Sequence, residues 1–192
     1  EVELPYGLTK MGSGAFANAR LKSVSLPSTL EIMNAPNEAV EIEINPFYGN
    51  PFLTSIKVDE GNKVYKSDGN CVIRIADNML AVGCRASEIP SYVERIGNYA
   101  FCEADLTSLT LPEGLVSIGK FAFYRNVRLT ELKLPQSPES IGSDAFLECV
   151  GLESVYFGAS LESIGDGAFG VCVNLESITV SSDNERFFSE GN

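Results

Sequence analysis

Apolar residues recur along this chain with a period much longer than that of a helix or a strand. Four blocks between residues 96 and 169 have the pattern Ile-Gly-x-x-Ala-Phe, and successive blocks are 22 or 23 residues apart. The phenylalanines that end these blocks are Phe101, Phe123, Phe146 and Phe169. A fixed period of this length indicates a repeat architecture, in which one structural unit per period stacks on the next.

Each block is followed, five or six residues later, by a short stretch in which apolar and polar positions alternate. The apolar positions are Leu106/Leu109/Leu111, Leu129/Leu132/Leu134, Leu152/Val155/Phe157 and Leu175/Ile178/Val180. Alternation predicts a short strand with one buried face, and the prolines after Leu111 and Leu134 are expected to end two of these strands. Because one turn cannot bury its apolar residues alone, stacked turns are expected to pair their strands in parallel.

The rest of the chain carries less regular copies, and we expect residues 1–192 to form a single domain. Residues 1–58 hold a looser copy around Phe16 and a degenerate one around Phe47, whose 31-residue spacing places about eight extra residues within 34–45. The regular repeats occupy 91–180. Residues 181–192 resemble the stretch that follows Val58, so they are expected to begin a further unit or to form a C-terminal tail.

Residues 59–90 predict a β-hairpin unit. Two apolar runs, 71–75 and 79–84, flank an Ala-Asp-Asn turn. If Ile75 pairs with Leu80, the register places Cys71 opposite Cys84, where a disulfide is sterically possible in an oxidising location. Unbridged cysteines are the alternative, and the sequence leaves both open.

The full pattern, I-G-x-x-A-F-x-x-C-x-x-L-x-x-I-x-L-P, resembles the BspA-like class of leucine-rich repeats, known from gut and oral Bacteroidetes proteins. The departures are Pro46 before Phe47, the missing proline after Val58, Phe157 and Val180, and the long second turn. The resemblance implies an α/β leucine-rich-repeat solenoid, right-handed, with short parallel strands on its concave face and interrupted by a β-hairpin insert. It also implies a secreted or cell-surface location, a role in adhesion or protein binding, and no catalytic residues.

Composition narrows the function classes further. The formal net charge of −12 disfavours nucleic acid and anionic membranes as partners, because both repel an acidic chain. The chain has no histidine, which removes the commonest general base and the commonest metal ligand. No apolar run approaches the roughly 18 residues of a membrane span, and the first residues lack the features of a signal peptide, which is expected to have been removed or never present.

Three motifs that suggest chemistry have simpler interpretations. Gly12–Ala17 has the glycine spacing of a dinucleotide-binding loop, but its glycine and alanine occupy the slots of the repeat. Cys149 and Cys172 lie three residues after a phenylalanine, a slot that also holds Asn126 and two alanines, which favours a buried ladder over a metal site. The acidic turns at 59–61 and 182–185 lack EF-hand spacing. We therefore expect no cofactor and no metal.

The outward positions of the predicted strands form the candidate binding face, on which small hydroxyl side chains dominate and Tyr156 is the one large aromatic. The candidate ligand-binding residues are Lys57, Thr110, Glu131, Lys133, Tyr156 and Thr179. Such a face suits weak, additive contacts with a protein or glycan on a host or neighbouring cell surface. Residues 34–45 are a second candidate, because inserted loops often carry recognition.

Two other functions stay open at this point. The chain could be a structural spacer in a larger bacterial surface protein, as a monomer or with weak end-to-end association. A glycan-binding or glycan-processing accessory is a more remote alternative, because hydrolysis needs two convergent carboxylates and Glu131 alone offers no pair. We expect a protein that is not an enzyme.

Overall fold

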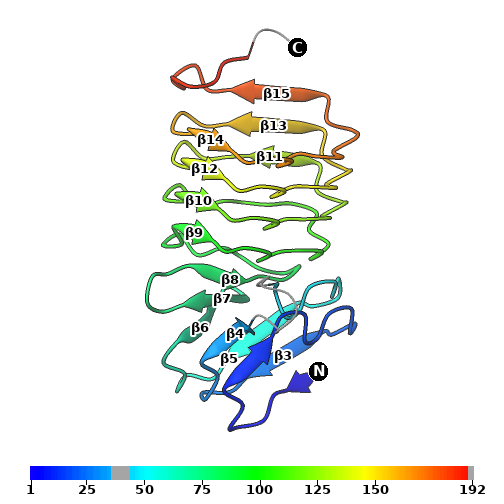
Figure 1. The fold of residues 1–192 in the computed structure, drawn as a ribbon, viewed down its shortest axis with the longest axis vertical. Coiled ribbons are helices and arrows are strands. Elements are labelled where there is room, and N and C mark those ends of the chain that lie inside the picture. The colour runs from blue at the N-terminus through cyan, green and yellow to red at the C-terminus, as the bar shows by residue number, and fades with distance from the viewer. Residues whose placement is uncertain (36–43, 190–192) are drawn as a thin grey trace.

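The computed structural model describes residues 1–35 and 44–189, and it is a stack of about seven turns (Figure 1). Every regular element in the described part of the chain is a strand, so the α component of the predicted α/β class is not confirmed. The repeat itself explains this result. Each Ile-Gly-x-x-Ala-Phe block holds a residue with positive φ, as at Tyr99 (56°), Phe121 (52°) and Asp144 (56°), which interrupts any right-handed helical run.

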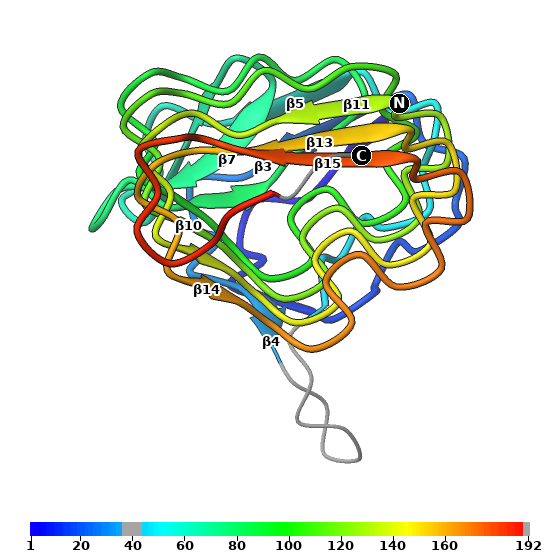
Figure 2. The same ribbon diagram turned by 90° about the horizontal axis from the view of Figure 1, so that it is seen from above.

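The alternating segments form two separate parallel sheets of three strands each. The strands of the first are β1 (Val2–Glu3), β3 (Ser23–Leu26) and β5 (Ser55–Val58), and those of the second are β11 (Glu131–Lys133), β13 (Ser154–Phe157) and β15 (Ser177–Val180). Seen along the stack, these strands lie on one side and β10 and β14 on another (Figure 2). The predicted parallel pairing is confirmed for these segments.

A seven-stranded sheet, which the sequence reasoning missed, contains the strands of that other side and, at its other end, strands that lie against β5. Its strands are β6 (Tyr65–Asp68), β7 (Cys71–Arg74), β8 (Leu80–Val82), β9 (Arg95–Ile96), β10 (Ser117–Ile118), β12 (Ser140–Ile141) and β14 (Ser163–Ile164). The isoleucines of the repeat blocks anchor it, because Ile96, Ile118 and Ile141 are each only 2% exposed. Three successive repeats therefore contribute strands to two faces of the stack, through β10 and β11, β12 and β13, and β14 and β15.

The region predicted as a hairpin insert belongs to this larger sheet. β6, β7 and β8 pair antiparallel, and β8 then pairs in parallel with β9 through Leu80 and Ile96. An insert that interrupts the solenoid as a separate unit is therefore not confirmed, because these strands continue the sheet of the repeats.

The predicted register of Cys71 and Cys84 is wrong. Val72 lies opposite Val82 and Ile73 opposite Leu80, with a register shift between the two pairs. Both cysteines are free and buried, and each thiol donates to a main-chain carbonyl: Cys71 to Gly69 at 3.6 Å and Cys84 to Asn70 at 3.6 Å.

A short pair of strands, β2 (Lys10–Gly12) and β4 (Ile32–Ala35), forms a separate sheet from the three larger ones. Most of the predicted insertion at 34–45 follows β4 and lies outside the described residues. Asn45, at its end, is buried, and its amide donates to the Ala100 carbonyl at 3.0 Å. This bond ties the N-terminal turns to the first regular repeat.

The core is a column of stacked phenylalanines. Phe101, Phe123, Phe146 and Phe169 stack in order, with ring centroids 5.2, 5.0 and 5.2 Å apart. The alanine that precedes each ring is nearly inaccessible to solvent. The N–H of each of the first three phenylalanines donates to the carbonyl of the alanine in the following turn, as from Phe123 to Ala145 at 2.8 Å. Burying one such ring stabilises the fold by about 1.5–3 kcal/mol.

The slot three residues after each phenylalanine is buried at Ala104, Asn126 and Cys149, as predicted, whereas Ala19 in the same slot is exposed. At Asn126 and Cys149 the slot holds hydrogen-bonding partners and not only apolar filler. The Asn126 amide donates to the carbonyls of Phe101 (2.9 Å) and Phe123 (2.8 Å). The thiol of Cys149 donates to Phe123 at 3.2 Å. Burial raises the pKa of Cys149 to about 12, so the thiol keeps its proton for this bond.

The slot holds asparagine where the preceding turn is one residue shorter, and cysteine where the preceding turn has the longer connection. Where phenylalanine and the next leucine are six residues apart, the leucine N–H bonds within its own turn, as from Leu152 to Cys149 at 3.0 Å. In the five-residue connections that end at Leu21 and Leu106, the N–H is accepted by the side chain of Asn50 or Asn126 in the next turn, at 2.8 and 3.0 Å. Asparagine therefore serves turns that are one residue short, because it accepts as well as donates.

Two distant turns repeat the same asparagine geometry. The Asn62 amide nitrogen donates to the carbonyls of Pro27 and Leu30 in the preceding turn. Its amide oxygen accepts from the N–H groups of Val64 and Tyr65 in its own turn. Asn184 bonds to Gly158 and Leu161 in the same way, with the same acceptor role toward its own turn. The sequence likeness between the stretches that follow Val58 and Val180 thus reflects one local structure, as far as residue 189.

Candidate functional site

The sheet of β11, β13 and β15 carries a shallow hollow of about 450 Å³, which we call the central hollow. Four of the six predicted ligand-binding residues line it. Three of them form a row across adjacent strands, because Lys133 lies opposite Tyr156 and Tyr156 opposite Thr179. Glu131 lies two residues before Lys133 on the same face, so the hollow places a cation, a phenol, a hydroxyl and a carboxylate together.

Gln136 fixes the phenol of Tyr156. Its amide nitrogen donates to the Tyr156 hydroxyl at 3.0 Å, and its amide oxygen accepts from the Ala159 N–H at 2.7 Å. This hydrogen bond, with smaller effects from Ser181 and the Lys133 charge, lowers the pKa of Tyr156. Sequence reasoning missed Gln136 because it follows Pro135, beyond the alternating stretch that drew attention to the strand.

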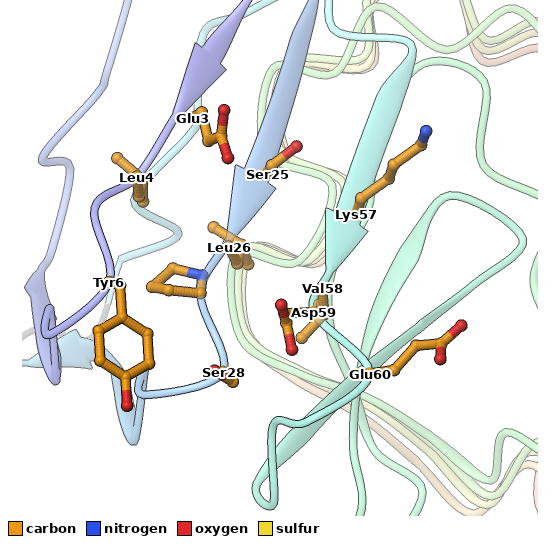
Figure 3. A pocket seen from close by; sticks show the side chains of 11 residues that line it. Glu3, Leu4, Tyr6, Ser25, Leu26, Ser28, Lys57, Val58, Asp59 and Glu60 are labelled. Carbon is orange, nitrogen blue, oxygen red and sulfur yellow. The ribbon is translucent and has the colours of Figure 1, made fainter.

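Lys57 lies in a different place, on the sheet of β1, β3 and β5. There it forms a second row, in which Glu3 pairs with Ser25 and Ser25 with Lys57. Figure 3 shows these three side chains projecting from neighbouring strands above Tyr6 and Leu26. The hollow beneath them is about 410 Å³. The single face predicted from the sequence is therefore divided into two.

Thr110 belongs to neither sheet. The segment from Leu106 to Leu111 was predicted as a strand, but the structure forms none there, because it enters no ladder with β11 or with any other described strand. Leu109 is only partly buried, whereas its counterparts Leu132 and Val155 are 2% exposed. The alternation of the sequence is present at Leu109, but the partner strand is not.

The described residues offer little for metal or nucleophile chemistry. Within 1–35 and 44–189, no three carboxylate or thiol side chains gather in a way that could hold a metal ion. Burial raises the pKa of Cys71 and of Cys102 to about 12, which keeps both thiols protonated and unreactive. No helix of the described part is long and apolar enough to cross a bilayer.

Solved structures with the same fold include bacterial leucine-rich repeat proteins. A leucine-rich repeat protein from Eubacterium ventriosum matches with a TM-score of 0.71 and 21% identity, over 94% of this chain and 55% of that one. The pneumococcal vaccine antigen PcpA matches with a TM-score of 0.57 and 19% identity, over 94% and 57%. A leucine-rich cell surface protein from Faecalibacterium prausnitzii gives 0.57 and 20%, over 94% and 59%.

This chain thus spans between 55% and 59% of the length of these three structures, and identities at this level show the fold alone. A comparison with curated proteins gives no match. The model of the BspA type leucine rich repeat region matches six copies, over residues 1–71 and 82–190. The stacked phenylalanines, the slot ladder and this match agree, and the chain belongs to the BspA type leucine-rich repeat family.

Proposed function

We propose that this chain is a non-catalytic interaction module that is displayed on a cell surface or secreted, and that it binds a protein or glycan through the central hollow. The observation that carries the proposal is the row of Lys133, Tyr156 and Thr179, three side chains of different chemistry held in register on one sheet. The family supports an interaction role. The names of two relatives, a cell surface protein and a vaccine antigen, support the location.

The chemistry of the hollow favours recognition over catalysis. Tyr156 is an aromatic side chain with a fixed hydroxyl, of the kind that contributes strongly to interfaces. Glu131 is the single carboxylate among the residues that line the hollow, and two-carboxylate glycoside hydrolysis requires a second one nearby. The remaining groups donate and accept hydrogen bonds, which suits a polar ligand surface.

A spacer role is the second candidate, and the first sheet favours it. At the N-terminal ends of β3 and β5, Ser23 lies opposite Ser55. These two small hydroxyl side chains offer little contact area to a ligand. If the other sheet also binds nothing, the chain would serve only to extend a longer surface protein.

Binding to immobilised extracellular-matrix proteins and mucin glycans, measured by biolayer interferometry, separates these candidates. We expect saturable binding of the wild-type chain to one member of the panel. Lys133→Ala and Tyr156→Ala should each weaken it by about tenfold, which corresponds to roughly 1.4 kcal/mol. Lys57→Ala is the matched control, because this exposed lysine lies on the other sheet.

Each other outcome has a definite meaning. If Lys57→Ala weakens binding and Lys133→Ala does not, the site lies on the sheet of β1, β3 and β5 and the central hollow is the wrong surface. If the wild-type chain binds no member of the panel, the interaction proposal is overturned in favour of the spacer.

A further inference from the structure

A groove of about 630 Å³ lies where the strand face of the solenoid is interrupted, between segments 87–91 and 108–113, and we call it the gap groove. It is separate from the central hollow, with which it shares no lining residue. The neighbouring strand β11 is the edge of its own sheet, because its one ladder among the described strands is with β13. The gap groove therefore sits at a break in main-chain pairing.

The main chain along one wall of this groove is unpaired. Among the described residues, no hydrogen bond involves Thr107, Ser108, Leu109 or Thr110, and these four residues do not form a turn of their own. Equivalent positions in the next turns do pair, as Leu132 with Val155 and Val155 with Ile178. A row of free N–H and C=O groups beside a groove is the feature that strand addition uses.

The floor of the groove is apolar. Phe101 and Leu106 are 1% and 4% exposed, and they line it together with the partly buried Ile89 and Leu109. An extended segment that pairs with this wall would direct every second side chain toward this floor. The groove therefore suits a strand with apolar residues at alternate positions.

The rim adds a charge preference. Glu88 and Glu113 are both exposed and line the groove, and none of the lining residues is lysine or arginine. The carboxylates favour basic side chains at the outward positions of an occupant and disfavour acidic ones. Backbone, floor and rim together specify one kind of ligand.

We propose that the gap groove binds an extended segment of a partner protein, with alternating apolar and basic residues, by adding it as a strand beside residues 107–111. This site does not depend on binding at the central hollow. It gives Thr110, one of the residues singled out from the sequence, a role at a separate site through its main chain.

The test uses a fluorescent six-residue peptide in which valine alternates with lysine, followed by fluorescence anisotropy with the whole chain. We expect saturable binding, weakened about tenfold, or roughly 1.4 kcal/mol, by Glu88→Lys with Glu113→Lys. Glu162→Lys, at an exposed carboxylate far along the chain, is the control for attraction to an acidic protein, and it makes half of the charge change of the double variant. A peptide with the same side chains but N-methylated alternate amides should lose binding, because it cannot complete the ladder.

Hydrogen–deuterium exchange gives a second readout that the central hollow does not influence. The amides of residues 107–111 should exchange rapidly in the free chain and become protected when the peptide is added. The proposal is overturned if the peptide does not bind, if the N-methylated peptide binds equally well, or if Glu162→Lys weakens binding as much as the groove variants. It is also overturned if residues 107–111 gain no protection on binding.

Discussion

At the scale of single residues, the fold depends on buried polar side chains that form hydrogen bonds with main-chain groups of a neighbouring turn. Asn126 is fully buried and makes three hydrogen bonds, two as donor and one as acceptor from the Leu106 N–H. The acceptor role exists because the turn before it is one residue short. Cysteine fills the same slot where the preceding turn is longer and no acceptor is needed.

Replacing Asn126 should therefore lower the free energy of unfolding in proportion to the number of hydrogen bonds removed. Asn126→Ala should lower the free energy of unfolding by about 1–3 kcal/mol for each buried group left unpaired. Asn126→Cys should cost less, because a thiol can still donate to a carbonyl as Cys149 does. Chemical denaturation measures both, with the exposed amide in Asn174→Ala as control. Equal losses for alanine and cysteine at position 126 would contradict this account of the slot.

Asp77 provides a residue-scale prediction about pH. Its carboxylate accepts two hydrogen bonds from Arg74, at 2.8 and 2.7 Å, and contacts Arg95 at 2.9 Å. The hydrogen bond from Arg74 is the main reason why the pKa of Asp77 falls from 3.8 to about 2. A lowered pKa in the folded state stabilises the protein above pH 4, and this contribution disappears as the pH falls from about 4 to about 2.

Melting temperatures of the wild type and of Asp77→Asn at several pH values check this expectation. The variant should melt at a lower temperature than the wild type at pH 5, and the two should converge near pH 2. A difference that is the same at both pH values would mean that the charge of Asp77 is not responsible.

At the scale of elements, close approach of successive turns limits side-chain size at the glycine of each repeat block. A Cβ built on Gly142 would lie 2.7 Å from main-chain atoms of Gly119 and Lys120 in the preceding turn. Gly114 is different, because a Cβ there would meet only the Ser91 carbonyl oxygen, at 3.9 Å. The block glycines therefore set the spacing of the seven-stranded sheet.

Gly142→Ala should force two turns apart and destabilise the protein by about 1–3 kcal/mol, as overpacking usually does. Gly114→Ala should leave the melting temperature nearly unchanged or raise it slightly, because the space is free. Thermal unfolding followed by circular dichroism compares the two. A Gly114→Ala variant as unstable as Gly142→Ala would point to backbone flexibility, and not to turn spacing, as the cause.

The elements also show how far the sequence predicts this structure. The phenylalanine column and the parallel strands follow from residue spacing, because each apolar position needs a partner in the next turn. The two-residue strands such as Ser117–Ile118 were missed, since two residues are too few to display alternation. The register at Cys71 and the unpaired Leu109 were predicted wrongly, because a register shift and a missing partner strand depend on neighbouring turns that local alternation does not encode.

At the scale of the whole molecule, the seven-stranded sheet is continuous through β8 and β9, while the opposite side is divided into two sheets of three strands. The binding surfaces follow this division: the central hollow on β11–β13–β15, the row with Lys57 on β1–β3–β5, and the gap groove between them along the chain. The predicted residues Glu131, Lys133, Tyr156 and Thr179 do come together, whereas Lys57 and Thr110 lie elsewhere. Position along a strand was predictable from the sequence, but membership of a common sheet was not.

The most direct test of the proposed interaction role is the dissociation constant for the tightest ligand of the matrix-protein and mucin panel, compared between the wild type and one combined variant. That variant carries Lys133→Ala, Tyr156→Ala and Thr179→Ala, and its melting temperature should match the wild type because the three side chains lie outside the core. We predict a loss of affinity of about a hundredfold or more, which corresponds to roughly 2.8 kcal/mol. Undiminished binding by a correctly folded combined variant would contradict the account.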